Sequence, residues 1–237
     1  MRKLVIAGCA VLLAACATNN PAGPSAGSIA RPESEQASTS DARSKAKIHV
    51  ELGTAYLEGA RFSVALDEAK AALGYDYSYA PAHLLLASVY SYLEQYELAQ
   101  PEFETAARLA PGDPEVNNSY GWFLCSRGRE SEGLQRLLQA ARNPYYNAPG
   151  KAYTNAGLCY LRMKDEASAE QQFTRAYQLD QGNRVALFQL AAISYRAGKY
   201  DRAKQWLAML QRQMPASTAE TLWLGLRIER QLGNRSG

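Results

Sequence analysis

From residue 44 to the end of the chain, apolar residues recur at the spacing of amphipathic helices. A small residue returns at a nearly fixed interval over this stretch, in the pairs Leu52-Gly53, Leu86-Ala87, Tyr120-Gly121, Ala156-Gly157, Leu190-Ala191 and Leu224-Gly225. The second members of successive pairs are 34, 34, 36, 34 and 34 residues apart. Such a period predicts helical hairpins that stack in a row and bury their apolar faces against one another.

The second half of each period has the same regularity. Twelve residues after each of the first five pairs comes another small residue, and large apolar residues follow it at helical spacing. This pattern resembles the tetratricopeptide repeat, in which small residues sit where the two helices of a hairpin cross. The resemblance implies an all-α, right-handed superhelical solenoid of six repeats over 44–237, the last being a single capping helix. The extra two residues between repeats 3 and 4 fall in NPYYNAPGK (143–151), which predicts a turn.

The N-terminus, MRKLVIAGCAVLLAACAT, has the form of a secretory signal. A basic pair precedes an apolar stretch that is too short to span a bilayer permanently. The sequence LAAC at 13–16 resembles a bacterial lipobox, in which the cysteine sulfur takes the lipid. We therefore predict a lipoprotein signal peptide at 1–15 and lipidation of Cys16. The alternative is an ordinary signal peptide cleaved at an Ala-x-Ala-like site.

The residues after Cys16 indicate where the domain is held. Ala17 stands where an Asp would favour retention in the inner membrane, so we expect a lipid anchor in the outer membrane, on its periplasmic face. Residues 17–40 are rich in Pro, Gly, Ser and Ala and nearly free of large apolar side chains, so they bury too little surface to fold. We predict that 16–43 is a lipidated, flexible periplasmic linker.

Composition excludes several classes of partner. Without Arg2 and Lys3, which leave with the signal, the chain has 24 basic and 23 acidic residues, a net charge of +1. No basic stripe points to a nucleic acid. The sequence also lacks a phosphate-binding loop and a dinucleotide fingerprint, so we expect no cofactor and no small-molecule substrate.

The two histidines, His49 and His83, are 34 residues apart. A metal pair is one interpretation, but both fall at the fourth position of their repeat, where a bulky side chain packs. Equal spacing is then a by-product of the repeat, and we predict no metal site. With both histidines packed, none remains for a Ser/His/Asp or Cys/His arrangement, so we expect no enzyme.

Two cysteines remain after Cys9 leaves with the signal and Cys16 is lipidated. Cys125 and Cys159 lie on the first helices of repeats 3 and 4, at positions 12 and 10. These positions differ by about 200° around a helix, so one side chain can face forward along the stack and the other back. We predict a disulfide between them, because disulfides persist in the periplasm. Two buried free thiols are the alternative.

First helices line the concave face of such solenoids, and by analogy positions 5, 9 and 12 point into the groove. We predict that this groove is apolar and binds a peptide of a protein partner. The alternative is that several of its residues only pack between repeats. The candidates are Val50, Leu57, Leu84, Trp122, Leu158 and Phe188, with Asn155 at the sixth position, where such domains often hold a peptide backbone.

A more specific resemblance rests on the lipobox together with three stretches, PGDPEVNNSYGWFLCSRGRESEG (111–133), NPYYNAPGKAYTNAGLCYLRMKD (143–165) and LWLGLRIERQLGN (222–234). This combination is similar to the type IV pilus biogenesis lipoproteins of the PilF/PilW type. The resemblance implies an outer-membrane pilotin that promotes localisation and multimerisation of the pilus secretin, its protein partner. The alternatives are an adaptor of another outer-membrane assembly machine and a regulator of cell-wall enzymes.

Overall fold

The computed structural model describes residues 29–214 and 216–233, which form eleven α-helices and one short 3₁₀-helix, η1 (Glu33–Glu35). The predicted signal peptide, Cys16 and residues 17–28 lie outside the described residues. The helices are α1 (Asp41–Glu58), α2 (Phe62–Tyr75), α3 (Ala80–Tyr92), α4 (Tyr96–Leu109), α5 (Pro114–Ser126), α6 (Glu130–Arg142), α7 (Pro149–Arg162), α8 (Glu166–Leu179), α9 (Arg184–Arg196), α10 (Tyr200–Arg212) and α11 (Ala219–Gln231).

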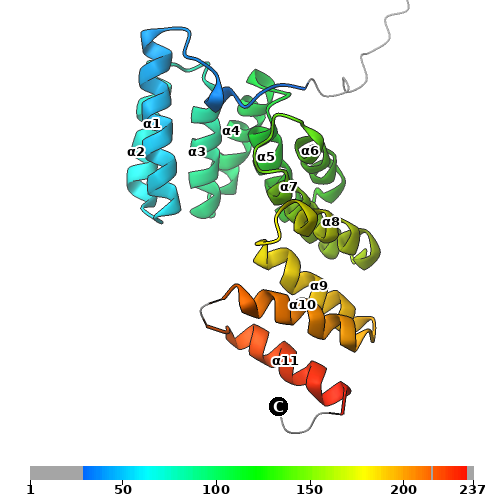
Figure 1. Ribbon diagram of the computed structural model, residues 1–237. Helices are drawn as coiled ribbons and strands as arrows, with labels where there is room; N and C mark the ends of the chain where they lie inside the picture. The colour runs from blue at the N-terminus through cyan, green and yellow to red at the C-terminus, as the bar shows by residue number, and fades with distance from the viewer. Residues whose placement is uncertain (1–28, 215, 234–237) are drawn as a thin grey trace, which may run out of the picture.

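The helices pair in chain order, α1 with α2 through α9 with α10, and the pairs stack into a curved row that α11 closes (Figure 1). The small residues of the repeat allow this close packing. A Cβ atom placed on Gly121 of α5 would lie 2.8 Å from the carbonyl oxygen of Gly133 of α6. The predicted all-α solenoid of five hairpins and a capping helix is confirmed over the described residues.

Local sequence explains where many of the helices begin. The side chains of Ser40, Asp165 and Asn183 accept hydrogen bonds from backbone N–H groups in the first turns of α1, α8 and α9. Proline occupies the first turn of α3, α5 and α7, where its missing N–H costs nothing.

The turn inside each hairpin has one residue with a left-handed backbone at the same place in the repeat. Glycine fills it at Gly128 (φ 79°) and Gly198 (φ 72°). Ala60, Glu94 and Lys164 take the same conformation with φ between 55° and 62°. The left-handed turn is therefore a general feature of the repeat. Residues with a side chain adopt it at three of these turns, although this conformation favours glycine.

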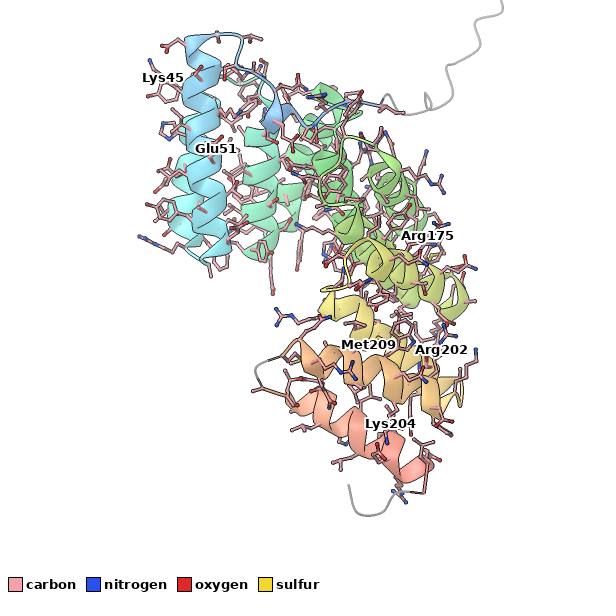
Figure 2. The ribbon with its side chains drawn as sticks, in the orientation of Figure 1. Lys45, Glu51, Arg175, Arg202, Lys204 and Met209 are labelled. Atoms are coloured by element: carbon pink, nitrogen blue, oxygen red, sulfur yellow. A yellow bond between two sulfur atoms is a disulfide. The ribbon has the colours of Figure 1, made fainter. Side chains whose placement is uncertain are left out.

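Ion pairs join neighbouring repeats towards the C-terminal end. Arg202 of α10 lies 3.1 Å from Glu170 of α8, and Lys204 of α10 lies 2.7 Å from Glu229 of α11. Figure 2 labels Arg202 and Lys204. These pairs are partly exposed, so each adds little stability on its own. Within the described residues no helix is both long and apolar enough to span a bilayer.

The N-terminal part of the domain differs from the predicted linker. The first helix starts at Asp41 instead of 44, and residues 30–36 are packed against the solenoid. We call residues 30–36 the strap. Composition did not predict it because the strap is held mainly by hydrogen bonds and ion pairs, whereas the prediction considered only apolar burial.

Candidate partner-binding groove

The first helices form the inner layer of the solenoid. Contacts join α1 with α3, α3 with α5, and α5 with α7, whereas no comparable contacts join successive second helices within the described residues. Elements that are closer together lie on the inside of a curve. From α1 to α7 the concave surface is therefore built from the first helices, as the resemblance to the tetratricopeptide repeat implied.

The predicted groove residues differ in how far they reach the solvent. Trp122 of α5 is the most accessible, with 37% of its surface exposed. Leu57 and Leu84 are half-buried and pack against core side chains of α3 and α5. Leu158 and Phe188 are also half-buried and pack on the cores of repeats 4 and 5. Binding by these residues stays a prediction, and Trp122 is the strongest candidate.

Val50 does not belong to the exposed groove, contrary to our expectation. Only 7% of its surface is exposed, and it packs with Ala46, Ala72, Tyr79 and Ala82. Tyr79 precedes α3 and is itself buried, so its ring fills the space beside Val50. Val50 therefore packs between repeats, which was the alternative interpretation for the groove residues.

Asn155 of α7 lies beside a polar residue that the sequence pattern did not single out. Its Nδ2 donates to Oδ1 of Asn118 on α5, at 3.0 Å. Asn118 occupies the fifth position of repeat 3, where the neighbouring repeats have Leu84 and Thr154, and it is buried. The sequence could have identified Asn118, because a polar side chain there stands at a position expected to line the groove. The pair links two inner helices, and Asn155, which is only partly buried, is the member that can reach the groove.

Cys125 and Cys159 are joined by a disulfide bond, with 5.7 Å between their Cα atoms. Both are fully buried, in a cluster with Leu134, Leu137 and Ala156. The bond links α5 to α7 and closes a loop that contains α6 and the insertion at 143–151. The pairing has the geometry that the repeat positions predicted.

Each histidine contacts a glutamate on the second helix of its own repeat. Nδ1 of His49 lies 2.6 Å from Glu68, and Nδ1 of His83 lies 2.6 Å from Glu102. The buried His83 also bonds through Nε2 to the carbonyl oxygen of Tyr77, at 2.8 Å. The two glutamates are 34 residues apart like the histidines, so the contact is a repeated link between helices. No cluster of three metal-binding side chains occurs in the part of the chain that the structure describes.

The edge where the first helices begin carries buried charge. Asp113 precedes α5 and is 2% exposed, and its carboxylate accepts from the N–H groups of Glu115 (2.8 Å), Val116 (3.2 Å) and Glu33 (2.6 Å). Burial raises the pKa of Asp113, although the three N–H groups act in the opposite direction. Burial likewise raises the pKa of Glu115, whose carboxylate accepts a hydrogen bond from the hydroxyl of Ser34 at 2.9 Å. The strap thus contributes two donors to this acidic pair.

The sequence is similar to the tetratricopeptide repeat and to two bacterial proteins. Models of the tetratricopeptide repeat match residues 80–113 and 160–222. The chain is 29% identical over 187 residues to the type IV pilus assembly protein PilF of Pseudomonas aeruginosa, covering 79% of this chain and 74% of that protein. It is 30% identical over 155 residues to an uncharacterized protein of Haemophilus influenzae, covering 65% of this chain and 86% of that protein.

Solved structures agree with the sequence relatives. The structure of Pseudomonas aeruginosa PilF superposes with a TM-score of 0.77 at 28% identity, covering 83% of this chain and 88% of that one. The structure of PilW, described as a widely conserved type IV pilus biogenesis factor, superposes with a TM-score of 0.73 at 30% identity, covering 80% and 87%. The similarity therefore extends over most of the solenoid.

Proposed function

Because the chain belongs to the PilF/PilW family of tetratricopeptide-repeat proteins, we propose that it serves the assembly of type IV pili as a pilotin. In this role a lipid on Cys16 fixes the protein to the outer membrane, and the concave groove holds a segment of the pilus secretin while secretin subunits multimerise. The single observation that carries the proposal is the similarity to PilF and PilW over most of the chain in both sequence and structure.

The proposed activity is binding without catalysis. A groove of half-buried apolar side chains beside the Asn118–Asn155 pair suits an extended or helical peptide with apolar anchors and a free backbone amide. The lipid anchor would keep the captured segment at the membrane and so raise its local concentration there.

The anchor is tested first. The change Cys16→Ser removes the sulfur that would take the lipid, so the variant should leave the outer-membrane fraction. A variant that still sediments with the outer membrane through its own hydrophobic association would contradict the anchor. A deletion strain should lose heat-resistant secretin multimers and twitching. Normal multimers in that strain would remove the pilotin proposal and favour an adaptor of another assembly machine.

The groove is tested with a matched pair of truncations. Trp122→Ala removes the accessible aromatic side chain of the inner layer, and Leu98→Ala removes a 50% exposed side chain of the second helix α4. We expect fewer secretin multimers only with Trp122→Ala, with equal melting temperatures for the two variants. A central aromatic anchor typically contributes about 2 kcal/mol or more to binding. Equal multimer levels in both variants would move the binding site away from Trp122.

A further inference from the structure

The strap crosses the edge of the solenoid where the first helices begin. Arg43, which follows the strap in α1, pairs with Glu33 of the strap and with Asp76, which follows α2. The guanidinium of Arg43 also lies over the ring of Tyr79, 4.7 Å from its centre. Burial would lower the pKa of Arg43, but the bonds to Asp76 and Glu33 outweigh it and raise the pKa. Arg43 thus fixes the strap to the junction of repeats 1 and 2.

The middle of the strap docks on the start of α5. The N–H of Glu33 donates to the buried carboxylate of Asp113, and the hydroxyl of Ser34 donates to Glu115. These bonds join residues about 80 positions apart in the chain, since Ser34 and Glu115 are separated by 81 residues. Ionised acceptors strengthen such bonds, and the buried carboxylate of Asp113 depends on them for compensation.

Both ends of the strap contact the loop that carries the two-residue insertion between repeats 3 and 4. Nδ2 of Asn143 donates to the carbonyl oxygen of Ala30 at 2.8 Å, and Nδ2 of Asn147 donates to Glu35 at 2.8 Å. Arg31 lies over the ring of Tyr145, 5.0 Å from its centre. All three partners fall in the one inter-repeat loop that departs from the regular period.

We propose that the insertion loop is the receptor for the strap, and that the docked strap turns this edge of the solenoid towards the lipid bilayer. The membrane part of the inference rests on the lipid anchor proposed above. With the strap docked, the chain leaves the domain at Ile29 beside repeats 3 and 4 (Figure 1), so covalent geometry limits the distance from Cys16 to the domain to about 45 Å. A free linker up to Asp41 would allow about 85 Å.

Side chains on this edge suit a bilayer surface. Tyr77 is 72% exposed, Tyr75 48%, Tyr145 46% and Leu109 41%, and all lie at the ends of second helices or in the loops that follow them. A tyrosine ring with its hydroxyl is favoured at the boundary between lipid and water. The opposite edge also exposes apolar side chains, among them Leu93 and Met163, so the exit point of the chain is what selects the membrane-facing edge.

Docking is tested with a cross-link that does not depend on the membrane. In the full mature chain carrying Cys16→Ser, the pair Glu35→Cys and Asn147→Cys should react with a short bifunctional maleimide to give an intramolecular product. The pair Glu35→Cys and Met163→Cys, with its second cysteine on the opposite edge, should not. Equal cross-linking of both pairs, or none in the first, would overturn the docked strap.

Orientation is tested with the lipidated chain in vesicles of phosphatidylethanolamine and phosphatidylglycerol that contain a spin-labelled lipid. Cys125 and Cys159 are bonded and Cys16 is acylated, so one added cysteine is the only thiol for an environment-sensitive fluorophore. Labels at Tyr77→Cys and Leu109→Cys should be quenched more strongly than labels at Leu93→Cys and Met163→Cys. Replacing 30–36 by a Gly/Ser segment of equal length should abolish the difference.

The outcomes separate the two proposals. A chain that fails to float with the vesicles overturns the lipid anchor and, with it, the orientation. A chain that floats but shows equal quenching at both edges overturns the orientation alone. A quenching difference that survives replacement of the strap shows that the strap does not set the orientation.

Discussion

Removing the disulfide should cost the domain about 4 kcal/mol. The bond between Cys125 and Cys159 spans a sequence separation of 34 residues. Closing a loop of about 35 residues lowers the entropy of the unfolded chain by an amount worth about 4 kcal/mol at 25 °C, before any strain is subtracted. For a domain of this size such a loss lowers the melting temperature by roughly 8–16 °C.

The assay compares oxidised and reduced wild-type protein, because reduction leaves every other atom in place. Melting is followed by circular dichroism, and hydrogen exchange shows where the stability is lost. Since each repeat is held by its neighbours, α6 and the insertion loop should gain exchange first. The double variant Cys125→Ala with Cys159→Ala is the control, since reductant should not shift its melting.

Two results would refute this reasoning. Oxidised and reduced proteins that melt within about 2 °C of each other would mean that the loop contributes less than roughly 1 kcal/mol. Free thiols in the denatured, unreduced protein isolated from the periplasm would mean that the bond does not form in its native compartment.

Two further changes probe packing and charge. Gly157→Ala places a Cβ 2.7 Å from the buried ring of Phe173, so urea unfolding should show a loss of about 1–3 kcal/mol, whereas Gly74→Ala, whose added Cβ meets no atom beyond its own stretch of helix within 4 Å, should show none. Equal stabilities would contradict the close contact. Burial raises the pKa of Asp113, so its carboxylate costs stability above the folded pKa and the cost disappears towards the ordinary value of 3.8. The melting temperature of wild type minus that of Asp113→Asn should therefore rise as the pH falls, and a difference that is constant or shrinks would refute the assignment.

Sequence predicted the solenoid well because its signal is repeated. The small residues at Gly53, Gly121 and Gly157 mark helix crossings, and the period locates every hairpin. The disulfide pairing followed from the same period. Exposure was harder, because position 5 faces the groove only when no neighbour covers it. Tyr79 covers Val50, and no pattern within repeat 1 contains that information.

The strap was missed for a different reason. Its partners, Asp113 and Asn143, lie 80 or more residues away along the chain, and each contact is a single hydrogen bond to the backbone. Such contacts produce no periodic pattern of residues in the sequence. The two-residue insertion could be located in the sequence. Nothing in the sequence connected it with the strap, and its only apparent neighbours were the two cysteines on either side of it.

The bond between Cys125 and Cys159 also has a topological consequence. It makes residues 125–159 a covalent ring that contains α6 and the loop at 143–148, in which Pro144, Tyr145 and Asn147 are exposed. A protease that cuts once inside this ring leaves a single molecule, and its two fragments separate on a gel only after reduction. The C-terminal repeats would then stay joined to the N-terminal half even when the loop that receives the strap has been severed.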